Sequence, residues 1–356
     1  MSTMSPEPGI DFGRPVRALR LFGGALSQRV DIRAATICLL LLLLAFAVAL
    51  VTLASGEFQV PFADVVRALL GQAEGRVHMV VVEWRLPRTA LAILLGAALG
   101  LAGAIFQSLT RNPLGSPDII GFDAGAYTGA LVVITLLGGS YFAVAGGALL
   151  GGLLTALLVY LLAYRRGVQG FRLIIVGIGV SAMLNSLNTW MLLRAKLEVA
   201  MAAAVWGAGS LNGLGLDRLS YAGTFLLVLI PLALMMSRPM AQLELGDDAA
   251  RALGVNAERN RLALLFLGVA LTATVTATAG PIGFVALAAP QLARRLTLSP
   301  GISMLPSAAM GALLLVSADF LAQRTFAPTQ LPVGIVTVSL GGVYFAWLLL
   351  REARRQ

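Results

Sequence analysis

The chain has 356 residues, of which 58% are hydrophobic and only 12% are charged. A soluble domain carries about twice this charged fraction, so the composition excludes a soluble protein and predicts a polytopic membrane protein of the all-α class. The net charge of +9 would suggest nucleic acid in a soluble domain, but in a membrane protein it reflects basic cytoplasmic loops, and no nucleic-acid partner is expected.

The chain has one cysteine, Cys38, one histidine, His78, and one lysine, Lys196. These counts exclude an internal disulfide and a Cys/His zinc cluster, and no metal site is expected. The sequence also lacks the pattern G-x-x-x-x-G-K-[ST] that wraps nucleotide phosphates, since Lys196 lies in RAKLE. We therefore expect no cofactor and no ATP hydrolysis in this chain.

Residues 1–33 are polar and basic, without the pattern of a signal peptide, and we interpret them as a cytoplasmic tail. A helix needs roughly 20 apolar residues to cross a bilayer. Ten such stretches predict one transmembrane domain over residues 34–350, followed by a cytoplasmic tail at 351–356. The predicted spans are residues 34–54, 87–108, 119–138, 141–164, 171–193, 219–237, 260–280, 282–297, 303–322 and 331–350.

The basic residues set the orientation. With both termini in the cytoplasm, 18 of the 26 Lys and Arg residues lie on the cytoplasmic side, as the positive-inside rule requires. Small residues recur at helix-packing spacing, as in Gly96, Gly100 and Gly103 of the second span and Gly147 and Gly151 of the fourth. They predict close approach between helices.

Few ionisable groups lie within the spans, and a transporter coupled to an ion gradient would need them. Asp123 and Asp319 lie near the ends of the third and ninth spans, and we interpret them as interfacial or packing residues. Asn185 and Asn188 of the fifth span are spaced to share one face. They could line a pathway or form interhelical hydrogen bonds.

The sequence ELGDDAARALGVNAERNR (244–261) is charged and prone to form helices, although apolar spans flank it. Gly246 and Gly254 bracket a short helix, DDAARAL, and its first residues, Asp247 and Asp248, suit the positive N-terminal end of a helix. We predict short helices over residues 242–260 that lie across the cytoplasmic face. Such helices can transmit motion from a soluble motor, although a solvated loop would have a similar composition.

Several long motifs resemble the permeases of ABC importers for iron siderophores, haem and cobalamin, in that family's order and over about residues 35–352. The matching segments are WRLPRTALAILLGAALGLAGAIFQSLTRNPLGSPDIIGFDAGA (84–126), FRLIIVGIG (171–179), WGAGSLNG (206–213), GDDAARALGV (246–255), AGPIGFVALAAPQLARR (279–295), LLLVSADFLAQ (313–323) and LPVGIVTVSLGGVYFAWLL (331–349). Three of the segments are most similar to the ferric-enterobactin branch of the family: EWRLPR, GSPDIIGFDAGA and GSLNGL.

This resemblance implies a cobalamin-permease-like fold of ten helices in the plasma (inner) membrane. It also implies two ATP-binding subunits that hold ATP and magnesium, a second permease subunit that is a paralogue or a second copy, and a periplasmic or lipid-anchored binding protein. The matching segment assigns coupling to the ATPase to seven residues: Gly246, Asp247, Asp248, Ala252, Leu253, Gly254 and Val255.

Two further sites follow from the resemblance. Arg85 and Arg88 match arginines that dock the binding protein at the outer face. The third docking position falls on Gln323, and the adjacent Arg324 is expected to take its place. At the cytoplasmic gate, Asn112, Pro113 and Leu114 match the family, whereas Gly170 and Phe171 stand where small hydroxyl residues are usual. The bulky Phe171 could itself form the plug.

The sequence therefore predicts a non-catalytic permease subunit that moves a ferric siderophore, of the catecholate type that includes enterobactin, with energy from a separate ATPase. The alternative is an ion-coupled secondary transporter or carrier that acts without an ATPase. A membrane enzyme is disfavoured because no cluster of His, Asp and Glu lies within the spans.

Overall fold

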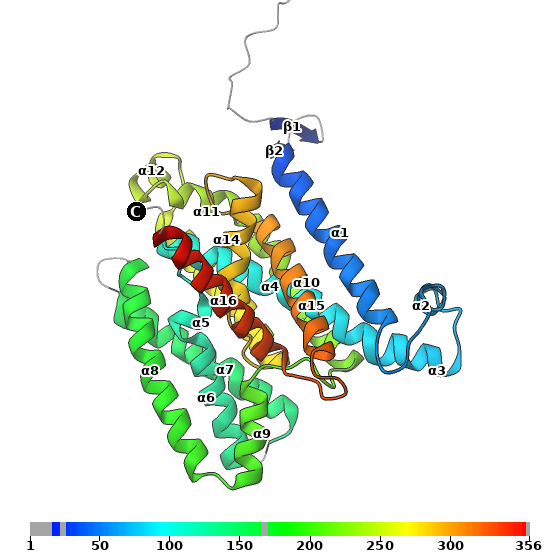
Figure 1. The fold of residues 1–356 in the computed structure, drawn as a ribbon. Helices are drawn as coiled ribbons and strands as arrows, with labels where there is room; N and C mark the ends of the chain where they lie inside the picture. The colour runs from blue at the N-terminus through cyan, green and yellow to red at the C-terminus, as the bar shows by residue number, and fades with distance from the viewer. Residues whose placement is uncertain (1–15, 22–25, 138, 165–169, 354–356) are drawn as a thin grey trace, which may run out of the picture.

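The computed structural model describes residues 16–21, 26–137, 139–164 and 170–353 (Figure 1). It begins with an antiparallel hairpin of β1 (Val16–Leu21) and β2 (Leu26–Asp31), which lies in the segment interpreted as a tail. All other regular structure in the described ranges is helical, which confirms the all-α fold. Asp31 ends the hairpin and caps the first helix, because its carboxylate accepts a hydrogen bond from the Ala34 amide.

The first two spans are connected by short helices at the outer side. The second span is longer than expected, because one uninterrupted helix runs from Gly75 to Thr110, and its π-helical stretch η2 carries the expected docking residue Arg85. The elements are α1 (Ile32–Ala54), α2 (Phe62–Leu69), α3 (Gly75–His78), η2 (Met79–Arg85) and α4 (Leu86–Thr110).

The third predicted span is broken in two at Gly121, whose φ of 96° interrupts the helix. A further helix, α9, follows α8 and was not expected from the sequence. The elements of this part are α5 (Pro117–Ile120), α6 (Phe122–Val132), the π-helical η3 (Val133–Leu137), α7 (Tyr141–Ala163), α8 (Gly170–Arg194) and α9 (Leu197–Gly207).

The second half contains the predicted cytoplasmic helices and the last four spans. The eighth predicted span is a helix of only 13 residues, which follows the Gly280-Pro281 break. The elements are α10 (Leu216–Met235), α11 (Ser237–Glu244), α12 (Asp247–Ala252), α13 (Ala257–Ala279), α14 (Val285–Thr297), α15 (Met304–Arg324) and α16 (Val333–Ala353).

Helix α4 lies at the centre of the bundle, with most of its residues buried, and it packs against α10, α13, α14 and α15. Glycines permit these close approaches, as predicted. A Cβ atom at Gly96 or Gly100 would overlap the backbone of α15, and one at Gly129 of α6 would overlap the backbone of α7 at Gly147. The core is therefore built on backbone contact between helices, which requires small residues at these positions.

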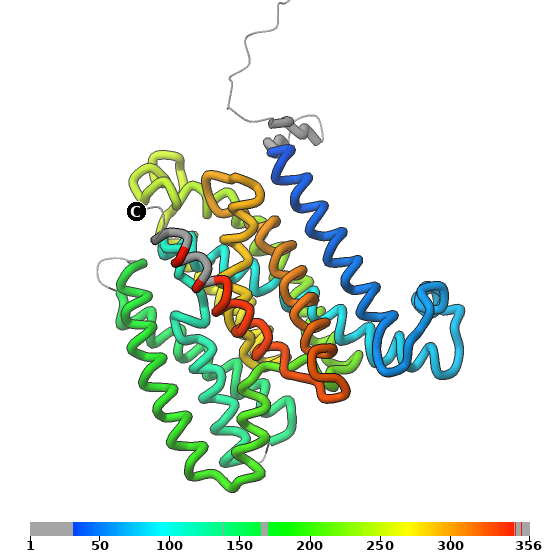
Figure 2. The backbone as a smooth tube through the Cα atoms, in the orientation of Figure 1, coloured from blue at the N-terminus to red at the C-terminus, as the bar shows by residue number. Residues whose placement is uncertain are grey.

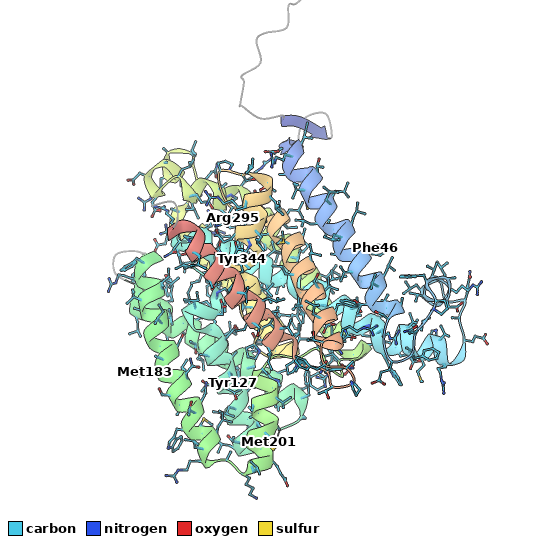
Figure 3. The ribbon with its side chains drawn as sticks, viewed as in Figure 1. Phe46, Tyr127, Met183, Met201, Arg295 and Tyr344 are labelled. Atoms are coloured by element: carbon cyan, nitrogen blue, oxygen red, sulfur yellow. The ribbon has the colours of Figure 1, made fainter. Side chains whose placement is uncertain are left out.

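Seven helices are long and apolar enough to span a membrane, and α6 with η3, α14 and α16 correspond to the remaining predicted spans. Apolar side chains such as Phe46, Met183 and Met201 are exposed on the outside of the bundle (Figure 3), as expected of surfaces that face lipid or another membrane subunit. The hairpin and α12 lie at one end of the molecule (Figure 1), whereas α2 and α3 project beside the opposite end of α1 (Figures 1 and 2). The chain is a multi-pass membrane protein.

Candidate functional site

The predicted stretch 242–260 contains the end of α11, the short helix α12 between the two expected glycines, and the first turn of α13. Gly246 precedes α12 with φ 115°, and Gly254 follows it with φ 82°. An L-residue rarely adopts such angles, so glycine is required for both changes of direction. A Cβ atom at either glycine would meet no other atom, and the constraint is therefore conformational rather than steric.

Asp247, the first residue of α12, attaches this helix to the membrane domain. Its Oδ1 accepts hydrogen bonds from the guanidinium of Arg261 on α13, at 2.6 Å, and from that of Arg111 at the end of α4, at 3.3 Å. The hydrogen bond from Arg261 is the main reason that the pKa of Asp247 is lowered, and the charge of Arg111 contributes. The carboxylate therefore remains charged at neutral pH, and these ion pairs would be lost only as the pH falls through its lowered pKa.

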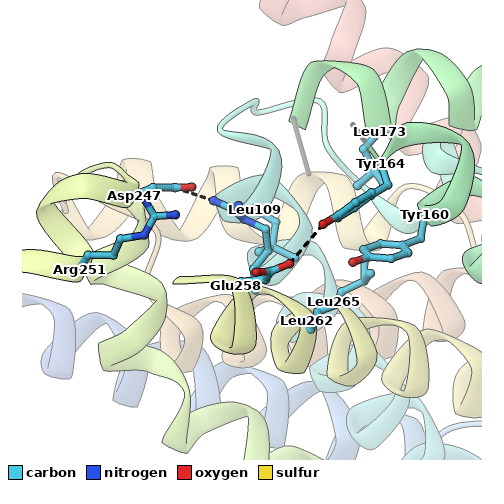
Figure 4. Close-up of a pocket in the computed structure, with 10 residues that line it drawn as sticks. Leu109, Tyr160, Tyr164, Leu173, Asp247, Arg251, Glu258, Leu262 and Leu265 are labelled. Atoms are coloured by element: carbon cyan, nitrogen blue, oxygen red, sulfur yellow. Dashed lines mark hydrogen bonds and ion pairs between the residues drawn. The ribbon is translucent and has the colours of Figure 1, made fainter. Parts of the chain in front are cut away.

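A cavity of about 120 Å³ lies beside α12, between the cytoplasmic ends of α4, α7, α8 and α13 (Figure 4). The hydroxyl of Tyr164 reaches Glu258 across it, at 3.4 Å, and Asp247 lines its other side. Apolar side chains, including Leu109 and Leu265, form its inner wall. The short helix is thus joined to the bundle through these polar side chains and through Ala250, which is buried in the main apolar core.

The first predicted gate segment is a tight turn. The side chain of Asn112 accepts a hydrogen bond from the Leu114 amide at 2.9 Å, and its carbonyl accepts one from the Gly115 amide. The second gate segment lies against the first, because a Cβ atom at Gly170 would overlap the backbone of Thr110, two residues before Asn112. The structure therefore places the two segments together. Leu114 and Phe171 are exposed, and Phe171 is 72% accessible.

Arg111 connects the gate turn to the coupling helices, a role that the sequence analysis did not identify. It is the left-handed C-cap of α4, with φ 50°, and directly precedes Asn112. Its Nη2 donates to the Leu243 carbonyl of α11, at 2.9 Å, as well as to Asp247. The position of this arginine directly before the Asn-Pro-Leu turn was the only signal in the sequence.

The expected coupling residues divide into two groups by exposure. Asp248, Ala252, Leu253 and Gly254 are exposed on the cytoplasmic surface, whereas Gly246, Asp247 and Val255 are partly buried against the bundle. The first group is accessible to another subunit, and the second group fixes the helix in place.

At the outer face, Arg88, which the resemblance assigns to docking, is buried. Its guanidinium is buried and pairs through two nitrogens with Asp319 of α15, whose side chain is fully buried. Its Nη1 donates to Gln330 at 2.6 Å, and Gln323 donates to the same carboxylate at 2.8 Å. Asp319 is therefore a packing residue with a bound counter-charge, and Arg88 joins α4 to α15.

The other two expected docking arginines differ in their surroundings. Arg85 is partly buried and donates to the carbonyls of Leu53 and Phe58, so it supports the connection between α1 and α2. Arg324 is exposed, with its guanidinium over the ring of Phe320. An outer cavity of about 640 Å³ is lined by Arg85 and Arg88 and also by Glu57, Glu83 and Trp84.

The two expected pathway residues do not share an environment. Asn188 is buried and donates to the Ala124 carbonyl of α6 at 3.4 Å, whereas Asn185 is exposed. Asn188 thus matches the alternative interpretation, an interhelical hydrogen bond. Asn185 remains available to line a pathway.

Two acidic residues lie within the bundle near the α5–α6 break. Asp118, which the sequence analysis did not single out, accepts a hydrogen bond from the Phe284 amide at 3.1 Å, just before α14 begins. Asp123 accepts one from the hydroxyl of Thr276 on α13 at 3.2 Å. Both carboxylates therefore join α5–α6 to the broken helix pair α13–α14.

Comparison with known proteins agrees with this arrangement. A family model described as the FecCD transport family matches residues 39–351. The chain is 50% identical to the ferric enterobactin transport system permease protein of Escherichia coli, over 90% of this chain and 97% of that protein. It is 36% identical to the achromobactin transport system permease protein of Dickeya dadantii, over 92% and 95% of the two chains.

The fold is also similar to a solved structure, a metal-chelate type ABC transporter in an inward-facing conformation. The TM-score is 0.79 and the identity 28%, with 89% of this chain and 99% of that chain covered. The similarity thus extends over nearly the whole length of both chains.

Proposed function

The chain belongs to the FecCD transport family, and we propose that it is a permease subunit of an ABC importer that carries a ferric siderophore inward across the inner membrane. The observation that carries this proposal is the pair of cytoplasmic helices α11 and α12, which Arg111 connects to the gate turn. This connection is the mechanical link that a subunit driven by a separate motor needs.

We propose a catecholate siderophore of the enterobactin type as the substrate. The support is 50% identity with the ferric enterobactin permease over almost its full length, compared with 36% for the achromobactin relative. The siderophore itself supplies the ligands of its iron, so this chain needs no metal ligands and provides a passage rather than a coordination site.

The proposed assembly contains two ATP-binding subunits, a second permease subunit that is a paralogue, and a binding protein on the outer side. ATP and magnesium bind in the ATP-binding subunits, and this chain is not an enzyme. The exposed residues Asp248, Ala252, Leu253 and Gly254 contact an ATP-binding subunit, and Arg324 contacts the binding protein. Leu114 and Phe171 project at the cytoplasmic end, where they can narrow the passage between the two permeases.

The substrate is tested by complementation. A strain that lacks its own ferric-enterobactin permease subunit receives this chain together with its partner subunits, and uptake of radioactive iron is measured. We expect uptake of ferric enterobactin and little uptake of a ferric hydroxamate. Uptake of the hydroxamate but not of the catecholate would contradict the proposed substrate class and leave the importer assignment intact.

A further inference from the structure

An apolar groove lies on the surface of the membrane domain, between α7, α10 and the C-terminal part of α13. It has a volume of about 410 Å³, within the roughly 300–1,000 Å³ that ligand sites occupy. Its walls are almost entirely apolar, with Leu149, Leu153, Phe225 and Leu229 among the lining residues. Phe225 is 63% exposed, so the groove is open to the surrounding membrane rather than enclosed.

One charged residue, Arg218, stands at the outer end of this groove. Its guanidinium lies over the ring of Tyr141 and near that of Phe142, and Phe142 in turn packs edge-on against Tyr221. The hydroxyl of Tyr141 donates to the carbonyls of Ala277 and Thr278 at the end of α13. Tyrosine is enriched where a membrane protein meets the membrane–water interface, so this end of the groove is expected at headgroup level.

Part of the Arg218 guanidinium is accessible to a ligand. Its Nε pairs with Asp217 at 3.0 Å and its Nη1 is enclosed by protein, but the side chain as a whole is 20% exposed. A phosphate oxygen is a strong, charge-assisted acceptor for the exposed part of a guanidinium. The carboxylate of Asp217 is 60% exposed and can accept from an ammonium group next to such a phosphate.

The length of the groove matches one leaflet. From Tyr141 to Leu153 the helix rises by roughly 18 Å at 1.5 Å per residue, and half of the hydrocarbon core measures about 15 Å. Along that length the lining changes from a cation through aromatic rings to aliphatic side chains, which is the order of polarity in a phospholipid.

We propose that this groove binds one glycerophospholipid of the outer leaflet, with its phosphodiester on Arg218 and an acyl chain along α7 and α10. Apolar contact alone does not distinguish this groove from bulk lipid, because lipid tails are as apolar as its walls. The selectivity therefore comes from the headgroup, and phosphatidylethanolamine fits the neighbouring Arg218 and Asp217.

The test uses the full-length chain, delipidated in detergent and incubated with phosphatidylethanolamine, and counts retained lipid by native mass spectrometry. Arg218→Gln should lower retention about tenfold, the effect of losing one hydrogen bond to a charged group. The matched control is Arg194→Gln, which removes another arginine near a ring, that of Trp190, outside the groove, and should retain lipid like the wild type.

A second pair of variants tests the acyl part without touching the arginine. A Cβ atom at Gly146, which lines the groove, would meet no other atom, so Gly146→Leu should fill the groove without strain and lower retention. Gly223→Leu places the same side chain at an equally open glycine of α10 outside the lining, and should leave retention unchanged.

Three results would overturn the proposal. The first is equal retention in Arg218→Gln and Arg194→Gln. The second is retention of diacylglycerol, which has the same chains without phosphate, as strong as that of phosphatidylethanolamine. The third is a change of oligomeric mass in Gly146→Leu without loss of lipid, which would show that a protein surface occupies the groove. If Arg218→Gln does not fold, the glycine pair decides the matter.

Discussion

At the residue scale, the two outer arginines Arg88 and Arg324 differ in their side-chain contacts. Arg88 neutralises a fully buried carboxylate, and its removal would leave Asp319 charged and unpaired inside the protein. Loss of one partner of such a pair costs about 3–5 kcal/mol, whereas apolar replacement of both is often neutral. Arg324 is exposed and supports no such pair in the described part of the chain.

We therefore predict opposite effects for these two arginines. Arg88→Leu should lower the melting temperature strongly, and the double variant Arg88→Leu/Asp319→Leu should recover most of the loss. Arg324→Glu should melt like the wild type but associate more slowly with the binding protein, most clearly at low salt. Thermal melts test the Arg88 variants, and docking rates at two salt concentrations test Arg324→Glu. A normal melting temperature for Arg88→Leu would show that the buried ion pair is unimportant.

Gly254 provides a second test at this scale. Its φ of 82° disfavours any L-residue, and β-branched residues most. Gly254→Val should leave the chain in the membrane but loosen its association with the ATPase and abolish siderophore-dependent growth. Gly254→Asn is the control, since asparagine tolerates left-handed angles, and it should keep much of the activity. Equal activity in the two variants would argue against a conformational role for this glycine.

The role of a single residue was predictable where its residue type has one common structural role in that local sequence. Gly246 and Gly254 were recognised because a glycine next to a short polar helix indicates a change of direction. The burial of Arg88 was not predictable, because its partner Asp319 lies 231 positions away and the sequence shows an arginine near a helix end in either case. Asn185 and Asn188 are three residues apart, a spacing that allows one face but does not require it.

At the scale of elements, α12 is a short helix that depends on side-chain anchors. Asp247 accepts from Arg261 on one side and from Arg111 on the other, but only Arg111 adjoins the gate turn. If α12 transmits force, loss of Arg111 must affect transport differently from loss of Arg261. Arg261 attaches the helix to the bundle, whereas Arg111 also attaches it to the gate turn.

We predict that Arg111→Gln uncouples transport from ATP hydrolysis, whereas Arg261→Gln does not. In the reconstituted importer, Arg111→Gln should reduce siderophore carried per ATP hydrolysed about tenfold, with ATPase association retained. Arg261→Gln removes the shorter hydrogen bond to the same carboxylate. It should lower the stability of the protein but leave the amount of siderophore carried per ATP hydrolysed unchanged. Arg111→Lys should recover part of the coupling because it keeps the charge. Equal ratios in the two glutamine variants would contradict the link through Arg111.

The long apolar elements were predictable, whereas the interruptions were only partly so. Spans such as α1, α7 and α8 agree with the expected residues to within two positions, because roughly 20 apolar residues have one use in a membrane chain. The break at Gly121 and the helix α9 were missed, since neither changes the hydrophobicity of its surroundings. The hairpin at residues 16–31 was missed because polar, basic composition alone indicates a tail.

At the scale of the whole molecule, the source of energy distinguishes the importer from the alternative, an ion-coupled carrier. Asp319 is excluded as an ion site by its pair with Arg88. Within the described residues, Asp118 and Asp123 are the other acidic groups inside the bundle, and both make hydrogen bonds that join α5–α6 to α13–α14. We interpret them as packing residues around the broken helices, so the driving force has to come from outside this chain.

Uptake of ferric enterobactin into vesicles tests this central claim most directly. The vesicles hold this chain with its partner permease, and the ATPase, the binding protein and ATP are supplied. Uptake should continue after a protonophore has collapsed the membrane potential, as long as ATP is maintained, and it should cease when the ATPase is omitted. Uptake that continues without the ATPase, or that stops with the protonophore despite ample ATP, would contradict the account and identify Asp118 or Asp123 as an ion-coupling site.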